Sequence, residues 1–504
     1  MRAAVVVPSI KDFYFTPHRG AFLGARTVAA VLERAGHHVD LFLFPISGKT
    51  KAIPLPPELS HLEPFLVPRE AGPTSFFTTY RRFGPPIPLC ADRIIASGPD
   101  VVLISSIAYC YLQEAIALAV ALRRRKPDLR IVGGGPGIAC AAERVRETGA
   151  FDALVVGEVE GVGEDLVGLP TDGSCAVLSA IVPDRPIFVP YVRRTKHRSF
   201  VSVQLSRGCP YGCEYCSTHL LFGRHVRRTP PTVVAESLAE LDLLPPVHIN
   251  IEDDNILLDR GYAFEIFEVI RSRWPAATFS AENGLDYRSL GSTDIDALCA
   301  VGFSAFNFTV ATTDDEILER QRRSGDPGHL YRLIRKAADL GVPSVTYFIC
   351  GLAGDSPAAV TRTLSALAAA PTRVGISPFY PVPGLAGYEN MARDTSVPPR
   401  LTAGSSAYPW TGALSTAQIV TAFRFSRLIN LAKRRGRSHG DEELLQRCFS
   451  DRRLLTTLRD AGGGLDVARP PGLDEELERS LFDAIAADGI EPVPGRFALD
   501  TSQA

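Results

Sequence analysis

One loop of ten residues organises this sequence: Arg207-Gly208-Cys209-Pro210-Tyr211-Gly212-Cys213-Glu214-Tyr215-Cys216. It follows an expected strand at 201–206 and carries its three cysteines in the spacing Cys-x3-Cys-x2-Cys. Three thiolates this close together can bind three irons of a 4Fe-4S cluster, whereas full ligation by protein takes four cysteines. The fourth iron then stays open to another ligand. That arrangement favours a site for an inner-sphere substrate over simple electron transfer.

Two other interpretations of the three cysteines stay open. A structural zinc site usually has four protein ligands, and the histidine nearest to the loop is His219. A lone histidine after such a loop is more often an ordinary polar side chain. The three thiols could also have no shared role. The motifs that flank the loop favour the cluster.

The composition is that of an ordinary globular protein of two or three domains, with 504 residues, 45% apolar and 22% charged. The formal net charge of −2 gives no reason to expect nucleic acid or an anionic membrane surface as a partner. Apart from the loop, the ten cysteines are scattered singly, unlike those of a secreted disulfide scaffold. The N-terminus reads as a buried strand, not as a signal peptide, and no apolar run reaches membrane-spanning length. We therefore expect a soluble, cytoplasmic protein.

The region 1–169 alternates apolar runs with helical stretches, which predicts an α/β fold with a doubly wound parallel sheet. The expected strands are 3–7, 39–44, 101–105, 131–132 and 153–156, the expected helices are 24–35 and 112–124, and 45–88 is an irregular excursion. In such sheets ligands bind at the carboxyl ends of the strands. Three loops fall there, and their residues are Ser105, Ser106, Gly134, Gly135, Pro136, Gly157 and Glu158. The glycine run is a poor nucleotide fingerprint, because Pro136 stands where the helix of a phosphate-binding loop would begin.

The rest of the chain starts with a connector at 170–199, and strand and helix patterns alternate again at 200–382. Six strand-led units, with strands at 201–206, 247–252, 278–282, 305–310, 344–349 and 373–377, predict a partial (β/α)6 barrel. Catalytic groups of such barrels gather at the carboxyl ends of the strands. The second strand ends in Glu252, Asp253 and Asp254, which could also form a solvated turn and helix cap. We expect 383–504 to be a small helical C-terminal cap, with helices at 415–435 and 474–486.

The cysteine loop resembles that of the radical S-adenosylmethionine (SAM) enzymes, in which an aromatic residue stands where this chain has Tyr215. The resemblance implies that the open iron is chelated by the amino and carboxylate groups of SAM. It places Asp253 and Asp254 near the ammonium, Asn283 and Thr309 near the ribose and carboxylate, and Ile349 and Gly351 beside the adenine. Two departures from the family pattern are Ala311, where relatives often have glutamate, and 351–355, where they have Gly-Leu-Pro-Gly-Glu.

The order of segments in 1–169 resembles the Rossmann-like, cobalamin-binding type of domain that precedes many radical SAM enzymes. The seven residues of its three loops are then the expected cobalamin contacts. The Asp-x-His-x-x-Gly motif that supplies a lower histidine ligand is missing, and Gly137 stands where relatives often have histidine. Relatives that bind the corrin without a histidine exist. A degenerate domain kept only as a scaffold is the alternative.

These resemblances predict a cobalamin-dependent radical SAM methyltransferase that acts on an unactivated carbon, or on phosphorus, of a small metabolite through a 5′-deoxyadenosyl radical. The alternatives are a radical SAM cyclase, oxidase or rearrangement enzyme, and a redox sensor or electron carrier. The expected cofactors are the 4Fe-4S cluster, SAM and cobalamin, and the expected reductant is flavodoxin or ferredoxin. The sequence identifies neither the substrate nor a catalytic residue.

Overall fold

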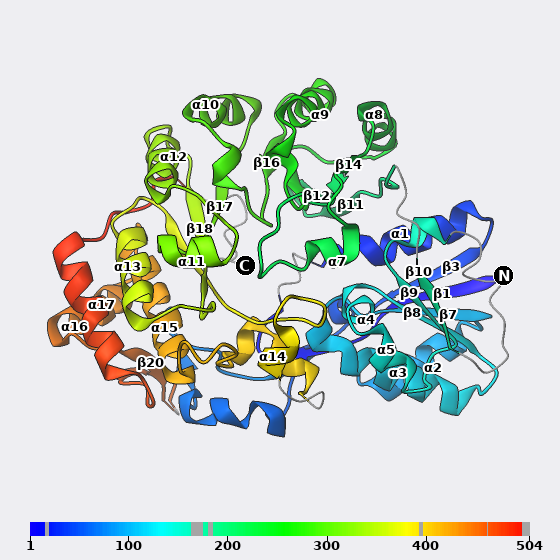
Figure 1. Ribbon diagram of the computed structural model, residues 1–504, viewed down its shortest axis with the longest axis horizontal. Helices are drawn as coiled ribbons and strands as arrows, with labels where there is room; N and C mark the ends of the chain where they lie inside the picture. Colours follow the sequence, from blue (N-terminus) through cyan, green and yellow to red (C-terminus); the bar gives the residue numbers. More distant parts are fainter. Residues whose placement is uncertain (16–19, 163–174, 180–184, 393–396, 461, 496–504) are drawn as a thin grey trace.

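The computed structural model describes residues 1–15, 20–162, 175–179, 185–392, 397–460 and 462–495 (Figure 1). It is an α/β protein with parallel sheets, which confirms the predicted fold class at that level. Among the described residues, no helix has both the length and the apolarity needed to cross a membrane. The N-terminal half contains β1 (Arg2–Val7), β2 (Ile10–Asp12), α1 (Leu23–Arg34), β3 (His38–Leu43), β4 (Lys51–Ala52), β5 (Glu70–Ala71), β6 (Arg81–Phe83), α2 (Ile87–Ala96), β7 (Val101–Ser105), α3 (Leu112–Arg125), β8 (Arg130–Gly134), α4 (Pro136–Ala139), α5 (Ala142–Arg146), β9 (Ala153–Val156) and β10 (Ala176–Ser179).

Six of these strands form one parallel sheet in the order β10-β9-β8-β7-β1-β3. The chain reverses its direction of travel across the sheet between β1 and β7, and such a switch point leaves a crevice at the carboxyl ends of the two strands. Both faces of the sheet are covered. Val5 and Leu103 pack against α1, whereas Val6 and Ile104 pack against α2 and α3. Burial on both faces explains why these strands read as continuous apolar runs.

The second half contains β11 (Tyr191–Arg194), β12 (Ser199–Val203), β13 (Ser206–Arg207), α7 (Thr218–Phe222), β14 (Arg227–Arg228), α8 (Pro231–Ala239), β15 (Val247–Ile251), α9 (Arg260–Arg273), β16 (Thr278–Ser280), α10 (Ser292–Val301), β17 (Phe306–Ala311), α11 (Asp315–Arg320), α12 (Pro327–Asp339), β18 (Ser344–Cys350), α13 (Pro357–Ala368), β19 (Arg373–Pro378), α14 (Tyr388–Ala392), α15 (Thr416–Lys433), α16 (His439–Asp451), β20 (Thr456–Arg459), β21 (Leu465–Ala468) and α17 (Glu475–Asp488).

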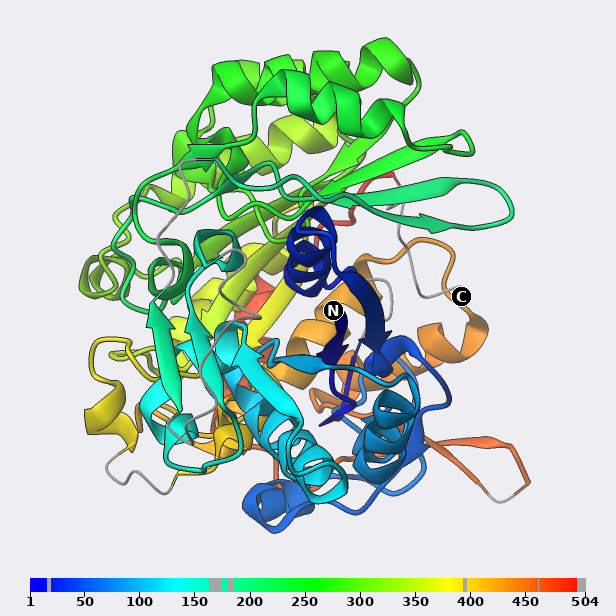
Figure 2. The same cartoon turned by 90° about the vertical axis from the view of Figure 1, so that its right-hand side faces the viewer.

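Strands β12, β15 and β16 pair in parallel, as do β17, β18 and β19. Two isolated parallel bridges, Phe279 to Phe303 and Leu285 to Phe308, join the two sets. Helices α8, α9, α10, α12 and α13 form an arc outside these strands (Figure 1). Seen from the side of the N-terminal sheet, that sheet lies below the green strands and helices of the second half (Figure 2).

The connector and the C-terminal part hold strands that the sequence analysis did not expect. Strand β10 lies in the expected connector and extends the first sheet beside β9, and β11 pairs antiparallel with β12. The C-terminal part is not wholly helical, because β20 and β21 form a hairpin. Each of these strands has only four residues, too few for a clear period of alternation.

The expected excursion at 45–88 is attached to the C-terminal part. Strand β5 pairs with β20, and Figure 1 shows this blue segment beside the orange helices. Glu70 next to β20 forms an ion pair with Arg424 of α15, with both side chains buried. Leu59 and Leu62 of a short 3₁₀ helix belong to the same apolar core as the strands of the second half. This segment therefore attaches the N-terminal half of the chain to β20 and α15 of the C-terminal part.

Candidate functional site

A cavity of about 520 Å³ opens at the carboxyl ends of the first sheet, beside the switch point between β1 and β7. One wall comes from the N-terminal half, including Gly24 of α1 and the ends of β7, β8 and β9. The opposite wall comes from the second half and includes Arg207, Asp254 and Asn283. The cavity therefore lies between the two halves of the molecule and reaches the residues that flank the cysteine loop.

Six of the seven residues expected to contact cobalamin line this cavity, namely Ser105, Gly134, Gly135, Pro136, Gly157 and Glu158. The seventh, Ser106, is buried behind the wall. Its backbone N–H donates to the carbonyl oxygen of Gly134 at 2.9 Å, and its hydroxyl donates to the carbonyl oxygen of Ala108 at 3.0 Å. Ser106 holds the loops after β7 and β8 together and presents no polar atom to a ligand.

The glycine loop differs from the expectation in one respect. Pro136 is the first residue of α4, so proline here begins a short helix. Proline is favoured at this position because it lacks only an N–H that would have no partner inside the helix. Gly135 before it has φ of 86°, and a Cβ there would lie 2.8 Å from Ser105 Oγ. At Gly137 a Cβ would lie 2.3 Å from Ser106 Oγ, so this loop has no room for a side chain at that position.

The carboxylate of Glu158 is used in a buried ion-pair network between the two halves. Arg207 Nη1 donates to its Oε2 at 2.7 Å, and Arg227 Nη1 donates to the same oxygen at 2.9 Å. Arg227 Nη2 also donates to Oε1, and Arg207 pairs with Glu160 at 2.8 Å. Glu158, Arg207 and Arg227 are only 4%, 6% and 4% exposed. Glu158 therefore joins the cavity wall to the strand that leads into the cysteine loop.

The cysteine loop runs from the end of β13 to the start of α7. Cys213 is buried, Cys209 and Cys216 are half-buried, and the backbone N–H of Cys216 donates to the carbonyl oxygen of Cys213 at 3.1 Å. The loop is anchored to α11, because the Glu214 N–H donates to the carbonyl oxygen of Gln321 at 3.2 Å. Cys213 and Cys216 therefore lie on one turn, and Cys209 precedes them by four residues in the same loop.

The zinc alternative has no grouped ligand set here. His219 lies half-buried on α7. Throughout the described part of the chain, no three His, Cys, Asp or Glu side chains are grouped so that they could hold one metal ion. A cubane cluster needs no such grouping, because each cysteine binds a different iron.

Asp253 and Asp254 support the loop from the end of β15. Asp253 is buried and accepts hydrogen bonds from the Leu205 N–H at 2.7 Å and the Ser206 hydroxyl at 2.5 Å. Burial raises the pKa of Asp253 to about 7, although these two donors act in the opposite direction. These hydrogen bonds hold the short link between β12 and β13, so the carboxylate of Asp253 faces the protein interior.

Asp254 borders both the cavity and the loop. It accepts hydrogen bonds from the Gly208 N–H at 3.3 Å and from the Thr218 hydroxyl at 3.2 Å. Thr218 Oγ1 also lies 3.4 Å from Cys216 Sγ, so one hydroxyl links the carboxylate to a cluster cysteine. Burial raises the pKa of Asp254, against the effect of these hydrogen bonds.

The other expected SAM contacts lie at the ends of the next strands. Asn283 lines the cavity, and its amide donates to the carbonyl oxygen of Glu252 at 2.8 Å. Tyr215 and Ile349 pack against the same small apolar cluster. Gly351 has φ of 91°, donates its N–H to Asp355 at 2.8 Å and accepts from the Thr411 hydroxyl at 3.0 Å.

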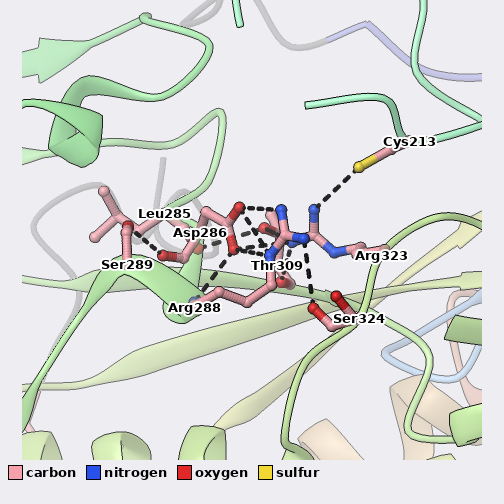
Figure 3. Close-up of polar contacts among 8 residues, drawn as sticks. All are labelled: Cys213, Leu285, Asp286, Arg288, Ser289, Thr309, Arg323 and Ser324. Carbon is pink, nitrogen blue, oxygen red and sulfur yellow. Dashed lines mark hydrogen bonds and ion pairs between the residues drawn. The ribbon is translucent and has the colours of Figure 1, made fainter. Parts of the chain in front are cut away.

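Thr309 leads to a pair of residues that the sequence analysis missed. Its carbonyl oxygen and hydroxyl accept from Arg323 Nη2 at 2.8 and 3.0 Å, and Arg323 Nη1 lies 3.8 Å from Cys213 Sγ (Figure 3). Asp286 lies 3.4 Å from the same guanidinium. Arg323 follows a helix end and not a strand, so the rule that placed the other site residues could not find it. In the sequence, the two neighbouring arginines Arg322 and Arg323 are a weak signal on their own.

Part of the chain matches a known protein family. The Radical SAM superfamily model matches residues 203–367, which include the cysteine loop and β15 to β18. This part of the chain is a radical SAM domain. The chain is 23% identical to a protein of Pyrococcus horikoshii that is named as an uncharacterized methyltransferase. This match extends over 295 residues, which are 53% of this chain and 63% of that protein. A hopanoid C-2 methylase of Rhodopseudomonas palustris is 25% identical over 177 residues, or 33% of this chain and 32% of the methylase.

A likeness of fold extends beyond the radical SAM domain. The structure of the radical SAM methyltransferase TsrM from Kitasatospora setae, with cobalamin and a 4Fe-4S cluster bound, superposes with a TM-score of 0.56 at 15% identity. The superposition covers 78% of each chain. At this level of identity the likeness concerns the fold. The match thus spans less than two thirds of the length of each of these two curated relatives, but 78% of the length of the TsrM chain.

Proposed function

We propose that this chain is a cobalamin-dependent radical SAM methyltransferase that acts on an unactivated carbon, or on phosphorus, of a small metabolite. The observation that carries the proposal is the position of the 520 Å³ cavity, which lies between the carboxyl ends of the first sheet and the flank of the cysteine loop. A ligand in this cavity would lie beside Arg207 and Asp254, the residues that flank the loop of Cys209, Cys213 and Cys216, which would hold the cluster. We interpret the first sheet as the Rossmann-like corrin domain and β12 to β19 as the partial barrel.

The residues present fit both groups. Three cysteines in one short loop suit a cluster with one open iron, and Arg323 places a buried N–H donor beside Cys213. Glycines at 134, 135 and 157 leave this part of the cavity wall free of side chains, so that a flat macrocycle could approach the backbone there. When bound, the cluster, SAM and cobalamin together would supply a 5′-deoxyadenosyl radical and a transferable methyl group.

The protein's own residues would bind and orient these groups. Asp254 is the carboxylate that borders both the cavity and the loop, so we assign it to the ammonium of SAM. Asn283 follows on the next strand and would face the ribose. Asp253 would hold the end of β12 in place, and the Glu158 network would keep the cavity wall at a fixed position against the loop. The proposed physiological reductant is flavodoxin or ferredoxin.

A corrin-retention experiment tests the proposal. The protein is purified without oxygen, supplied with iron, sulfide and hydroxocobalamin, and freed of unbound cofactor before its absorption spectrum is recorded. We expect corrin bands at about one per chain together with the cluster absorption. A cluster without corrin would overturn the methyltransferase and favour a cyclase, oxidase or rearrangement enzyme.

One glycine gives this experiment a selective variant. A Cβ at Gly24 would meet nothing within 4 Å, and Gly24 lines the cavity, so Gly24→Phe adds a ring at the cavity wall with no clash at its Cβ. We expect this variant to lose the corrin bands and to keep the cluster. Gly440→Phe is the matched control, because Gly440 is also an uncrowded helical glycine but lies exposed on α16. Equal corrin retention by both variants would mean that the cavity is not the corrin site.

The assignment of Asp254 has its own test. We expect Asp254→Ala to keep the cluster absorption and to lose reductive cleavage of SAM, measured as 5′-deoxyadenosine. Asp339→Ala on the exposed side of α12 is the control for loss of a carboxylate. Undiminished cleavage by Asp254→Ala would contradict the assignment.

A further inference from the structure

Arg323 is a buried cation beside a cysteine of the loop. Its side chain is 8% exposed. Nη2 donates to the carbonyl oxygen and the hydroxyl of Thr309, and Nη1 lies 3.8 Å from Cys213 Sγ (Figure 3). The remaining donor, Nε, is buried and has no hydrogen-bond partner among the described residues. Arg323 therefore still has N–H groups that can donate a hydrogen bond, and the sulfur of Cys213 lies close enough to accept one.

The position of Arg323 is set by the end of α11. The backbone N–H groups of Arg322 and Arg323 donate to the carbonyl oxygens of Glu319 and Leu318, and Arg322 has φ of 49°. This left-handed turn sends the two neighbouring arginines in opposite directions. The side chain of Arg322 is 74% exposed and pairs with Glu214 at 2.8 Å, whereas Arg323 points inward to Cys213.

Asp286 completes the group from the other side. Its carboxylate accepts from Arg288 Nε at 2.9 Å and lies 3.4 Å from Arg323 Nη2 (Figure 3). Burial would raise the pKa of Asp286, but the hydrogen bond from Arg288 and the charge of Arg323 outweigh it and lower the pKa. Asp286 is therefore an anion, and the two arginines leave this group with a net positive charge next to Cys213.

The reduction potential of an iron-sulfur cluster depends on net charge, on hydrogen bonds to its sulfurs and on solvent exposure. One electron added to the cluster adds one negative charge, which a nearby cation and N–H donor stabilise more than they stabilise the oxidised form. We propose that Arg323 raises the reduction potential of the cluster on Cys209, Cys213 and Cys216, with Asp286 and Thr309 holding it in place. This inference rests on the proposed radical SAM function.

Arg323 is thus a positioning residue that acts through Cys213, and the sign of the effect separates this role from a purely structural one. Removing the cation should make the potential more negative. Removing the anion with Asp286→Asn should make it less negative. A loop that was merely loosened by either substitution would change the potential in the same direction for both.

The test is an anaerobic redox titration of the reconstituted protein with dithionite and mediators, followed by electron paramagnetic resonance. At the midpoint potential of the wild type, we expect the ratio of reduced to oxidised cluster in Arg323→Gln to fall about tenfold, a shift of about 59 mV for a one-electron couple. Arg332→Gln is the matched control, since it removes an equal charge from the exposed side of α12, where Arg332 pairs with Asp326, and its ratio should stay close to that of the wild type.

The outcomes are distinct. A wild-type protein that assembles no cluster overturns the proposed function and this inference with it. An assembled cluster whose midpoint is the same in Arg323→Gln overturns the inference alone and leaves the function standing. Should Arg323→Gln assemble no cluster, Asp286→Asn decides the question: a rise in potential supports the role of Arg323, and no change or a fall overturns it.

Discussion

Replacing Glu158 with glutamine should destabilise the protein far more than an isosteric change usually does. In the native protein this carboxylate accepts from Arg207 at 2.7 Å and from Arg227 at 2.9 Å, and all three side chains are buried. Glutamine keeps the shape but removes the charge, and its amide N–H₂ must face an arginine donor. Arg207 keeps Glu160 at 2.8 Å, and Arg227 keeps the carbonyl oxygen of Phe222 at 2.9 Å. The cost therefore falls mainly on Arg227.

Its size follows from the burial. Removing one member of a buried ion pair costs about 3–5 kcal/mol, because the remaining charge stays out of water. At about 2 °C per kcal/mol for a domain of roughly 200 residues, the thermal unfolding midpoint should fall by about 6–10 °C. Differential scanning fluorimetry of the two proteins measures this change.

The control is Glu143→Gln, which breaks the exposed pair of Glu143 with Arg146 on α5. Exposed pairs contribute about 1 kcal/mol at most, so the midpoint should hardly move. If Glu158→Gln lowers the midpoint no more than Glu143→Gln does, the two halves are not held together by this network and the reasoning from burial is wrong.

Three further changes follow from single observations. Asp253→Asn should remove a pH dependence: the pKa of about 7 lies above the ordinary value of 3.8, so the folded protein binds this proton more tightly than the unfolded chain. The contribution of Asp253 to the free energy of unfolding therefore falls by on the order of 4 kcal/mol as pH rises from about 4 to 7. The difference between the unfolding midpoints of the variant and the wild type across that pH range measures this change. Gly137→His should not create a lower corrin ligand, because its Cβ would lie 2.3 Å from Ser106 Oγ. We expect the variant to lose about 1–3 kcal/mol of stability and to show weaker corrin bands. A stable variant with a histidine-ligated corrin spectrum would refute this expectation. Glu70→Gln should leave Arg424 buried without its carboxylate partner. We expect stability to fall by about 3–5 kcal/mol and proteolysis within 57–83 to become faster. Cleavage at the wild-type rate would count against this prediction.

The parts of the fold that could be predicted are those with strong local patterns. The run Ala3 to Val7 is apolar at every position because β1 is buried on both faces, and the structure places a strand there. Strand β10 pairs with β9 in the same sheet, but its residues 176–178 are only half-buried, and a strand of four residues does not differ from an apolar connector in its pattern. Pairing of β5 with β20 joins residues almost 400 positions apart, and no local signal could report it.

The site divides in the same way. The rule that groups collect at strand ends located Asp254 and Asn283 on the cavity wall, because it follows from the geometry of parallel strands. It could not tell that Asp253 turns inward to Leu205 and Ser206, since neighbouring residues at a strand end point to opposite sides. The role of Glu158 was also out of reach. It depends on how the two halves dock, and its partners lie 49 and 69 residues further along the chain.

That docking explains why charged residues occupy a place where apolar ones would cost less. A buried network of two arginines and two glutamates gains little over well-packed apolar side chains, because all four must lose their water. Its geometry, however, tolerates only one alignment of the partners. Arg207 directly precedes the cysteine loop and Glu158 lies in the cavity wall, so this alignment fixes the cavity against the loop. A reaction that passes a reactive group between two bound cofactors needs that distance held constant, and an apolar contact that could slide would not hold it.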